Sequence, residues 1–132
     1  MKENKLADLS MNFSIQMIEL VNVLKSKHET IIANQIGRSG TSIGANIYEA
    51  KYAQGKKDFI SELEIALKEA SETGYWLELL HRTNYIDDAV FHSLSGLFCS
   101  RCCLRQLRNF PQRNQHKKIG ALHSDLSYSA TK

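Results

Sequence analysis

Residues 57–83 read KDFISELEIALKEASETGYWLELLHRT, and their apolar side chains recur at helical spacing. Five of them follow steps of four, three, four and seven, the spacing of a seam between packed helices: Phe59, Leu63, Ala66, Ala70 and Leu77. An apolar stripe sustained over this length predicts a long amphipathic helix with one buried face.

Helical spacing also recurs on both sides of this segment, with short breakers between the helices. The sequence predicts four helices, at about residues 5–26, 30–53, 57–83 and 88–109, with Gly55 as the stop of the second. Short connections favour antiparallel neighbours, so we expect an all-α, up-down-up-down four-helix bundle over residues 1–110. Residues 111–132 are polar and predict a flexible tail.

The segment between the third and fourth predicted helices carries several turn signals. Asn84 can adopt the left-handed conformation that ends a helix, and Asp87 is a good N-cap for the next one. Ile86 and Phe91 occupy the two positions of a hydrophobic staple. Together these residues predict a tight helical hairpin.

Glycines interrupt the second predicted helix, where residues 37–44 read GRSGTSIG. A phosphate-binding loop would need a Gly-Lys-Ser/Thr ending and a preceding strand, and neither is present. Glycine inside a helix costs about 1 kcal/mol relative to alanine, so close approach of a neighbouring helix is the expected compensation. That neighbour can belong to the same chain or to a second subunit, and the sequence leaves both open.

A polar stripe runs beside these glycines. Arg38, Ser42, Asn46 and Glu49 follow steps of four, four and three along the helix. We interpret the stripe as an exposed or intersubunit hydrogen-bonded network in preference to a catalytic site, because polar stripes set orientation in helical assemblies.

No constellation of catalytic or metal-binding residues is complete. Glu78 and His81 match the Glu-x-x-His step of di-iron bundles, but the motif occurs once where such sites need it twice. The thiols of Cys99 and Cys102, even with His92, leave a structural zinc site short of its four ligands. We therefore expect no enzymatic activity, no metal and no cofactor.

Apolar runs, the N-terminal segment and the cysteines bear on where the protein is located. No run of about 18 apolar residues occurs, and the polar N-terminal segment does not resemble a signal peptide. The three cysteines, Cys99, Cys102 and Cys103, are bunched on one predicted helix and fit a reducing compartment. The expected protein is cytoplasmic and makes no membrane contact.

Charge is distributed in blocks along the chain of 132 residues, whose formal net charge is +3. Residues 1–57 carry eight basic and five acidic side chains, residues 58–88 carry two basic and eight acidic ones, and residues 89–124 carry six basic and none acidic. The last block can either neutralise the middle block or meet an anionic partner such as nucleic acid.

Arg101, Arg105 and Arg108 continue the apolar face of Val90, Leu94 and Leu97 on the fourth predicted helix. A hairpin centred near Tyr85 places Arg101 opposite Glu69 and Arg108 opposite Glu62, so ion pairs are one expectation. Phosphate binding is the other, supported by three more cations in the tail: Arg113, Lys117 and Lys118.

Residues 35–50, QIGRSGTSIGANIYEA, together with the KDF of residues 57–59, the IALKE of residues 65–69 and the pair Tyr75-Trp76, resemble a known family. This is the bacterial four-helix bundle protein family, which includes proteins encoded within intervening sequences of 23S ribosomal RNA genes. It is similar in fold to the accessory protein of diversity-generating retroelements.

The resemblance implies a left-handed four-helix bundle that assembles as a ring, often a pentamer, with a positively charged surface for RNA or DNA. It implies no enzymatic activity. The motif residues are expected to be structural or to lie at an interface: Arg38, Ser39, Ser42, Asn46 and Glu49.

We therefore expect a non-enzymatic homo-oligomeric bundle that binds structured RNA or another nucleic acid through non-specific phosphate contacts. The alternative is a protein-binding scaffold or adaptor with no nucleic-acid contact, whose arginines are consumed in salt bridges.

Overall fold

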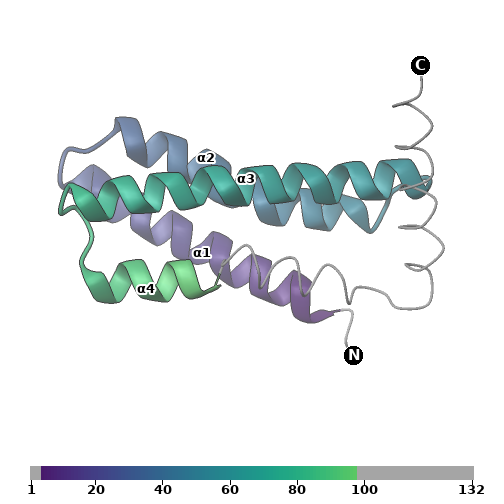
Figure 1. Cartoon of the computed structure of the whole chain (residues 1–132), viewed down its shortest axis with the longest axis horizontal. Helices are drawn as coiled ribbons and strands as arrows, with labels where there is room; N and C mark the ends of the chain where they lie inside the picture. Colours follow the sequence, from purple (N-terminus) through teal and green to yellow (C-terminus); the bar gives the residue numbers. More distant parts are fainter. Residues whose placement is uncertain (1–3, 98–132) are drawn as a thin grey trace, which may run out of the picture.

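The computed structural model describes residues 4–97, which form four α-helices and, within that range, no strand (Figure 1). The helices are α1 (Asn4–Ser26), α2 (Ile31–Ala50), α3 (Lys56–Arg82) and α4 (Asp88–Leu97). The all-α class is confirmed. The predicted continuation of the fourth helix to residue 109 and the tail at residues 111–132 lie outside the described residues.

The second helix ends at Ala50, earlier than the predicted residue 53. Beyond it the backbone tightens, because the N–H of Tyr52 donates to the carbonyl of Glu49 (2.9 Å) and that of Ala53 to Ala50 (3.3 Å), three residues back. Gly55 is the N-cap of α3 and not the stop of α2.

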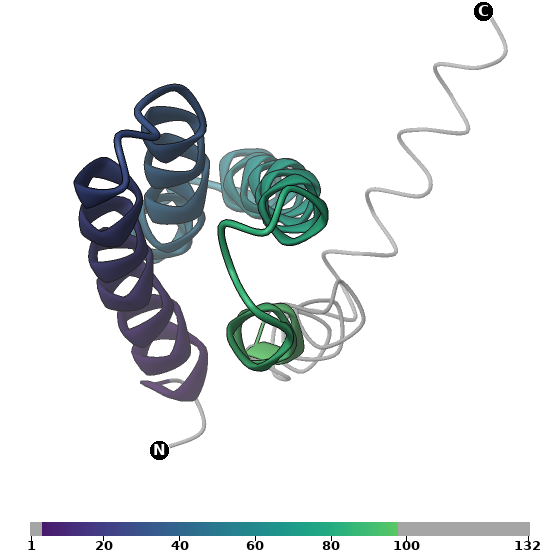
Figure 2. The ribbon, with the colours of Figure 1, turned by 90° about the vertical axis from the view of Figure 1, so that its left-hand side faces the viewer.

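The four helices surround one apolar core, as Figure 2 shows in the view along the bundle. α2 makes extensive contacts with both α1 and α3, whereas α4 contacts α3 and, to a smaller extent, α1. Among the largest fully buried side chains are Phe13 and Met17 of α1, Ile36 and Ile43 of α2 and Leu80 of α3.

The predicted α3 seam enters this core: Ala66, Ala70 and Leu77 are buried, and Leu63 packs against it. Burial of a large apolar side chain contributes about 1.5–3 kcal/mol, so Leu77 stabilises the fold more than the two alanines do. α4 differs from the expectation: Leu94 is buried, but Val90 and Leu97, predicted on the same face, are 38% and 36% exposed. Ile86, in the turn before α4, is buried in the core, and Phe91 packs against it.

The glycines of α2 lie against α1 of the same chain. A Cβ atom added at Gly40 would stand 2.5 Å from Cγ and 2.8 Å from Sδ of the buried Met17. One added at Gly37 would meet Val21 at 3.0 Å, and one at Gly44 would meet the hydroxyl of Ser14 at 2.9 Å. The close approach expected from the sequence therefore occurs within one chain, between α1 and α2.

A buried polar contact joins α2 to α3. Ser39 and Thr73 are 0% and 1% exposed, and their hydroxyl oxygens lie 2.9 Å apart. The Thr73 hydroxyl also reaches the carbonyl of Glu69, at 2.8 Å. Ser39 has one further acceptor, the carbonyl of Ile36, at a long 3.5 Å. The Thr73 hydroxyl is therefore the main partner of the Ser39 side chain.

The turn between α1 and α2 and the turn between α3 and α4 have the same backbone conformation. His28 and Asn84 have positive φ angles of 62° and 65°. After each, an N–H reaches back five residues: that of Glu29 to Leu24 and that of Tyr85 to Leu80, both at 2.9 Å. These are the bonds of a Schellman motif, and they confirm the predicted left-handed stop at Asn84.

The start of α4 is capped as predicted. The carboxylate of Asp87 accepts a hydrogen bond from the N–H of Val90, at 2.8 Å. Next to it, Nε2 of His81 lies 2.5 Å from Oδ1 of Asp88, and the His81 ring stacks on Phe91 with centroids 4.3 Å apart. The contact ties the last turn of α3 to the first turn of α4.

We expect Thr73→Val to lower the free energy of unfolding by about 1–3 kcal/mol, because it leaves the buried Ser39 hydroxyl without its main partner. Chemical denaturation of the two proteins measures this difference. Thr83→Val is the matched control, since the Thr83 hydroxyl is exposed and bonds its own helix, and it should change stability little.

The double variant Ser39→Ala/Thr73→Val removes both polar partners. It should be more stable than the Thr73→Val single variant, because no buried hydroxyl is then left unpaired. Strictly additive losses from the two substitutions would contradict this account.

The contact between His81 and Asp88 predicts a pH dependence. The hydrogen bond and the charge of His81 lower the pKa of the Asp88 carboxyl from its ordinary value. A folded-state pKa below the unfolded one means that the contact stabilises the hairpin above the ordinary aspartate pKa, and that this stability is lost as pH falls through the folded pKa.

An NMR titration of the Asp88 carboxyl carbon should give a midpoint below that of the same residue in the urea-unfolded chain. His81→Ala should move the midpoint back toward the unfolded value. A wild-type midpoint equal to or above the unfolded one would rule out this role for His81.

Candidate nucleic-acid interface

The predicted site residues fall into two groups. The motif residues lie on α2 and are described: Arg38, Ser39, Ser42, Asn46 and Glu49. The predicted phosphate-binding cations lie outside the described residues: Arg101, Arg105, Arg108, Arg113, Lys117 and Lys118. The same holds for the three cysteines, Cys99, Cys102 and Cys103.

Arg38 bridges α2 to two carboxylates of α3. Its Nη1 lies 3.4 Å from Glu69 and its Nη2 lies 2.5 Å from Glu72, which also accepts a hydrogen bond from the indole N–H of Trp76 at 3.2 Å. The hydrogen bond from Arg38 lowers the pKa of Glu72, and the same bond raises the pKa of Arg38. The Arg38 side chain is 51% exposed, so we expect each pair to contribute no more than about 1 kcal/mol.

The rest of the polar stripe bonds to its own helix. The Ser42 hydroxyl donates to the carbonyl of Arg38 (2.6 Å), and the Asn46 amide donates to the carbonyl of Ser42 (2.7 Å). Glu49 is exposed near the end of α2. Within the stripe, Arg38 therefore forms ion pairs with α3, whereas Ser42 and Asn46 form hydrogen bonds within α2. Ser39, beside it, is buried and structural.

Glu69 has a partner that the hairpin geometry does not anticipate, Arg38 of α2. The predicted partner, Arg101, lies outside the described residues, so that pairing stays a prediction. Glu62, predicted opposite Arg108, keeps one carboxylate oxygen buried with no hydrogen-bond partner among the described residues.

Most carboxylates of the acidic block already have partners within the described chain. Glu69 and Glu72 bind Arg38, and Glu78 binds Arg82 at 2.6 Å. Three aspartates make contacts at the turns. Asp58 accepts a hydrogen bond from the N–H of Gln54, Asp87 caps α4, and Asp88 binds His81. Of the eight acidic residues at positions 58–88, Glu62 and Glu64 are left without such a contact in residues 4–97.

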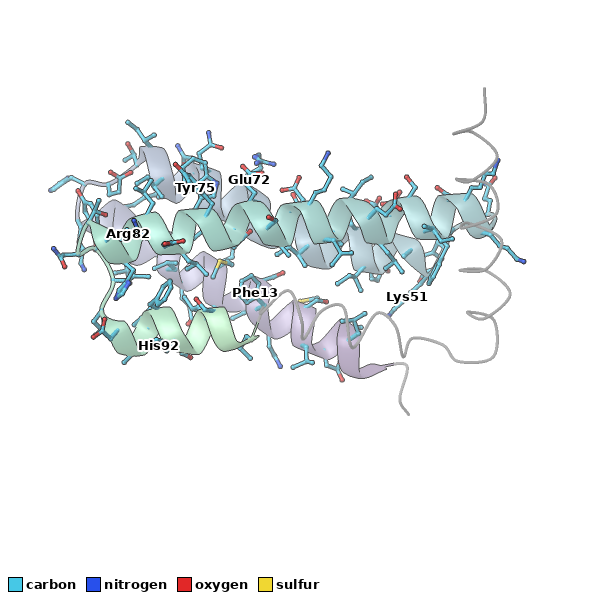
Figure 3. All side chains as sticks on the ribbon, viewed as in Figure 1. Phe13, Lys51, Glu72, Tyr75, Arg82 and His92 are labelled. Atoms are coloured by element: carbon cyan, nitrogen blue, oxygen red, sulfur yellow. The ribbon has the colours of Figure 1, made fainter. Side chains whose placement is uncertain are left out.

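Three of the described cations that make no ion pair lie at the α2–α3 turn. Lys51, Lys56 and Lys57 are exposed, and none lies within ion-pair distance of a carboxylate in residues 4–97. Figure 3 places Lys51 at this end of the bundle and Arg82 and His92 at the other. At that other end, the ammonium group of Lys27 donates to the carbonyl of Tyr85 at 3.0 Å, which ties α1 to the α3–α4 turn.

Two exposed tyrosines accompany the lysines of the α2–α3 turn. Tyr48 and Tyr52 are 58% and 70% exposed, and their ring centroids lie 5.4 Å apart. The sequence places them one helical turn apart and near the free lysines, yet it does not distinguish an exposed ring from a core ring. The sequence alone therefore does not predict them as site residues.

The Glu-x-x-His step is not assembled as a metal site, because Glu78 pairs with Arg82 and His81 with Asp88. Within residues 4–97, no three His, Cys, Asp or Glu side chains come together as a metal site would require. No described helix combines the length and apolarity needed to cross a membrane.

An open hollow of about 630 Å³ lies between α1 and α2. Its lining includes Met11 and Ser14 of α1 and Gly44 and Tyr48 of α2. The lining is mostly apolar and carries no cluster of catalytic groups, so the hollow suits packing against another apolar surface.

Comparison with known proteins gives a family match and similar solved structures, of which one is described below. Residues 2–100 match the 23S rRNA-intervening sequence protein family. A crystal structure of a protein of unknown function from the S23 ribosomal protein family of Bacteroides thetaiotaomicron VPI-5482 is similar to this chain. The two share 44% sequence identity with a TM-score of 0.75, over 83% of this chain and 96% of that one.

No curated protein matches the sequence. The family match spans most of the chain and includes all four described helices and the α2 motif. The chain therefore belongs to the 23S rRNA-intervening sequence protein family.

Proposed function

We propose that this chain is a non-enzymatic, cytoplasmic accessory protein that self-associates and binds RNA, or another nucleic acid, through non-specific phosphate contacts. The contacts are made by the basic block near the carboxyl end: Arg101, Arg105, Arg108, Arg113, Lys117 and Lys118. The alternative is a scaffold that binds a partner protein and no nucleic acid.

The proposal rests on one observation: most carboxylates of the acidic block, residues 58–88, already have partners within the described chain. Six of its eight carboxylates already accept hydrogen bonds, from Arg38, Arg82, His81 or the backbone N–H groups of Gln54 and Val90. The block at residues 89–124 holds six basic side chains and no acidic one. Hydrogen-bonded carboxylates keep their charge, but their oxygens are already engaged. Glu62 and Glu64, which have no such contact in residues 4–97, offer two ion-pair partners for six cations, which supports binding of the other cations to phosphates.

The proposed bundle is up-down-up-down, antiparallel and left-handed. Its support is the shortness of the three connections between helices and the packing of α2 against both α1 and α3.

Self-association is proposed from the outer face of α1. Met11, Ile15 and Ile18 are 61%, 50% and 52% exposed and lie within one narrow sector at about 100° per residue. This sector is opposite the buried side of α1 that holds Phe13 and Leu20. A helix with apolar residues on both faces has more apolar surface than its own chain covers, which favours an interface.

The family resemblance noted from the sequence implies a closed ring, and five is the proposed number of subunits. The hollow between α1 and α2 continues this apolar face through Met11. The same stripe is what favours the scaffold alternative, since it could accept a helix of a different protein.

Binding of a fluorescently labelled single-stranded RNA, followed by anisotropy, tests the nucleic-acid proposal. Affinity should fall steeply between 50 and 200 mM salt, because phosphate contacts release counterions. The variant Arg101→Ala/Arg105→Ala/Arg108→Ala should bind more weakly, with a salt slope smaller by about 0.7 for each phosphate that is no longer neutralised.

Arg82→Ala is the matched control, because it also removes a guanidinium but one already paired with Glu78. It should leave RNA affinity and salt slope unchanged. No measurable binding by the wild-type protein at 50 mM salt would eliminate the nucleic-acid proposal and leave the scaffold.

Light scattering tests self-association. The wild-type protein should have a mass several times that of the 15.0 kDa chain, fivefold for the proposed pentamer. Ile15→Glu should shift it to the monomer, because a carboxylate cannot be buried unpaired in an apolar interface. Ile31→Glu is the control, since Ile31 is 75% exposed and lies off the stripe. A 15.0 kDa wild-type particle at micromolar concentration would contradict the proposal.

A further inference from the structure

Two tyrosine rings stand in solvent at the end of α2. The rings of Tyr48 and Tyr52 are 5.4 Å apart at an interplanar angle of 53°, and they are 58% and 70% exposed. Two neighbouring rings exposed to this extent offer flat apolar faces on which another group can stack.

One cation lies over this pair, and two more follow along the chain. Nζ of Lys51 lies 5.8 Å from the centroid of the Tyr48 ring, within the range of a cation–π contact. Lys56 and Lys57 follow on the first turn of α3, beyond a connection of only a few residues.

Residues 50–57 carry these three lysines and no acidic side chain. Two carboxylates flank the turn. Glu49 is exposed on α2, and Asp58 accepts a hydrogen bond from the N–H of Gln54 at 3.2 Å. The turn therefore combines three lysines with two neighbouring exposed aromatic rings, a composition that suits a polyanion with flat apolar groups.

Single-stranded nucleic acid has this chemistry. Its unpaired bases expose faces that stack on aromatic side chains, and its phosphates attract lysines, whereas a duplex hides its base faces. We propose that the α2–α3 turn is a contact for single-stranded RNA, in which Tyr48 and Tyr52 stack on unpaired bases and Lys51, Lys56 and Lys57 contact the neighbouring phosphates. This inference rests on the proposed function, that the protein binds nucleic acid.

Stacking by the tyrosines and phosphate binding by the lysines should affect RNA affinity and its salt dependence differently. Stacking is worth enough per base that Tyr48→Ala/Tyr52→Ala should weaken binding of a single-stranded RNA by about tenfold or more, with little change in salt slope. Lys56→Ala/Lys57→Ala should instead reduce the salt slope, by about 0.7 for each phosphate that the lysines no longer neutralise. Tyr48→Phe/Tyr52→Phe keeps both rings and should bind as wild type.

The experiment measures anisotropy of one labelled RNA, single-stranded and annealed to its complement, with the full-length chain. Tyr75→Ala is the matched control, because Tyr75 is 61% exposed on α3 and packs edge-on against Trp76, away from the lysines of the turn. It should bind both RNAs as wild type does. The tyrosine double variant should lose affinity for the single strand far more than for the duplex.

The outcomes separate this inference from the proposed function. If the wild-type protein binds no RNA, both are overturned. If it binds and the Arg101/Arg105/Arg108 variant binds more weakly while Tyr48→Ala/Tyr52→Ala binds as wild type, the proposed function stands and this inference fails.

A protein partner at this turn is the remaining outcome. If Tyr48→Ala/Tyr52→Ala changes the particle mass in light scattering and leaves RNA affinity unchanged, the rings belong to a subunit interface. That result would also overturn the RNA contact.

Discussion

The structure depends on how closely α1 approaches α2. Three glycines of α2 leave room for Val21, Met17 and Ser14 of α1, and at Gly40 any side chain would overlap the buried Met17. A packed core cannot absorb an added methyl group without shifts that cost about 1–3 kcal/mol. This contact fixes which side of α1 packs against α2. It thereby determines which sides of both helices are left to face the other helices or solvent.

Two of these faces are functional in our account. With one side of α1 in the core, its opposite side presents an apolar stripe that residues 4–97 leave exposed. On α2, the side away from the glycines carries Arg38, which reaches α3 and occupies Glu69 and Glu72. The contact that builds the core therefore also decides which carboxylates remain to neutralise the basic block near the carboxyl end.

Local features were predictable from the sequence, and partners distant in the chain were not. Apolar spacing located the helices, and the conformational preferences of Asn84 and Asp87 located the α3–α4 turn, because both signals act within a few residues. The register of the α3–α4 hairpin involves those two helices alone, so it could not reveal that Arg38 of α2 competes for Glu69. The exposure of Tyr48 and Tyr52 was also out of reach, since it depends on which helices cover the end of α2.

The most direct test compares two glycine substitutions in unfolding free energy. Gly74→Ala, on an exposed side of α3 with no atom within 4 Å of the new Cβ, should stabilise the protein by up to about 1 kcal/mol through helix propensity. Gly40→Ala should destabilise it, because overlap with Met17 outweighs the same gain. If Gly40→Ala stabilised the protein as much as Gly74→Ala does, the close contact between α1 and α2 could not be the constraint on which the fold depends.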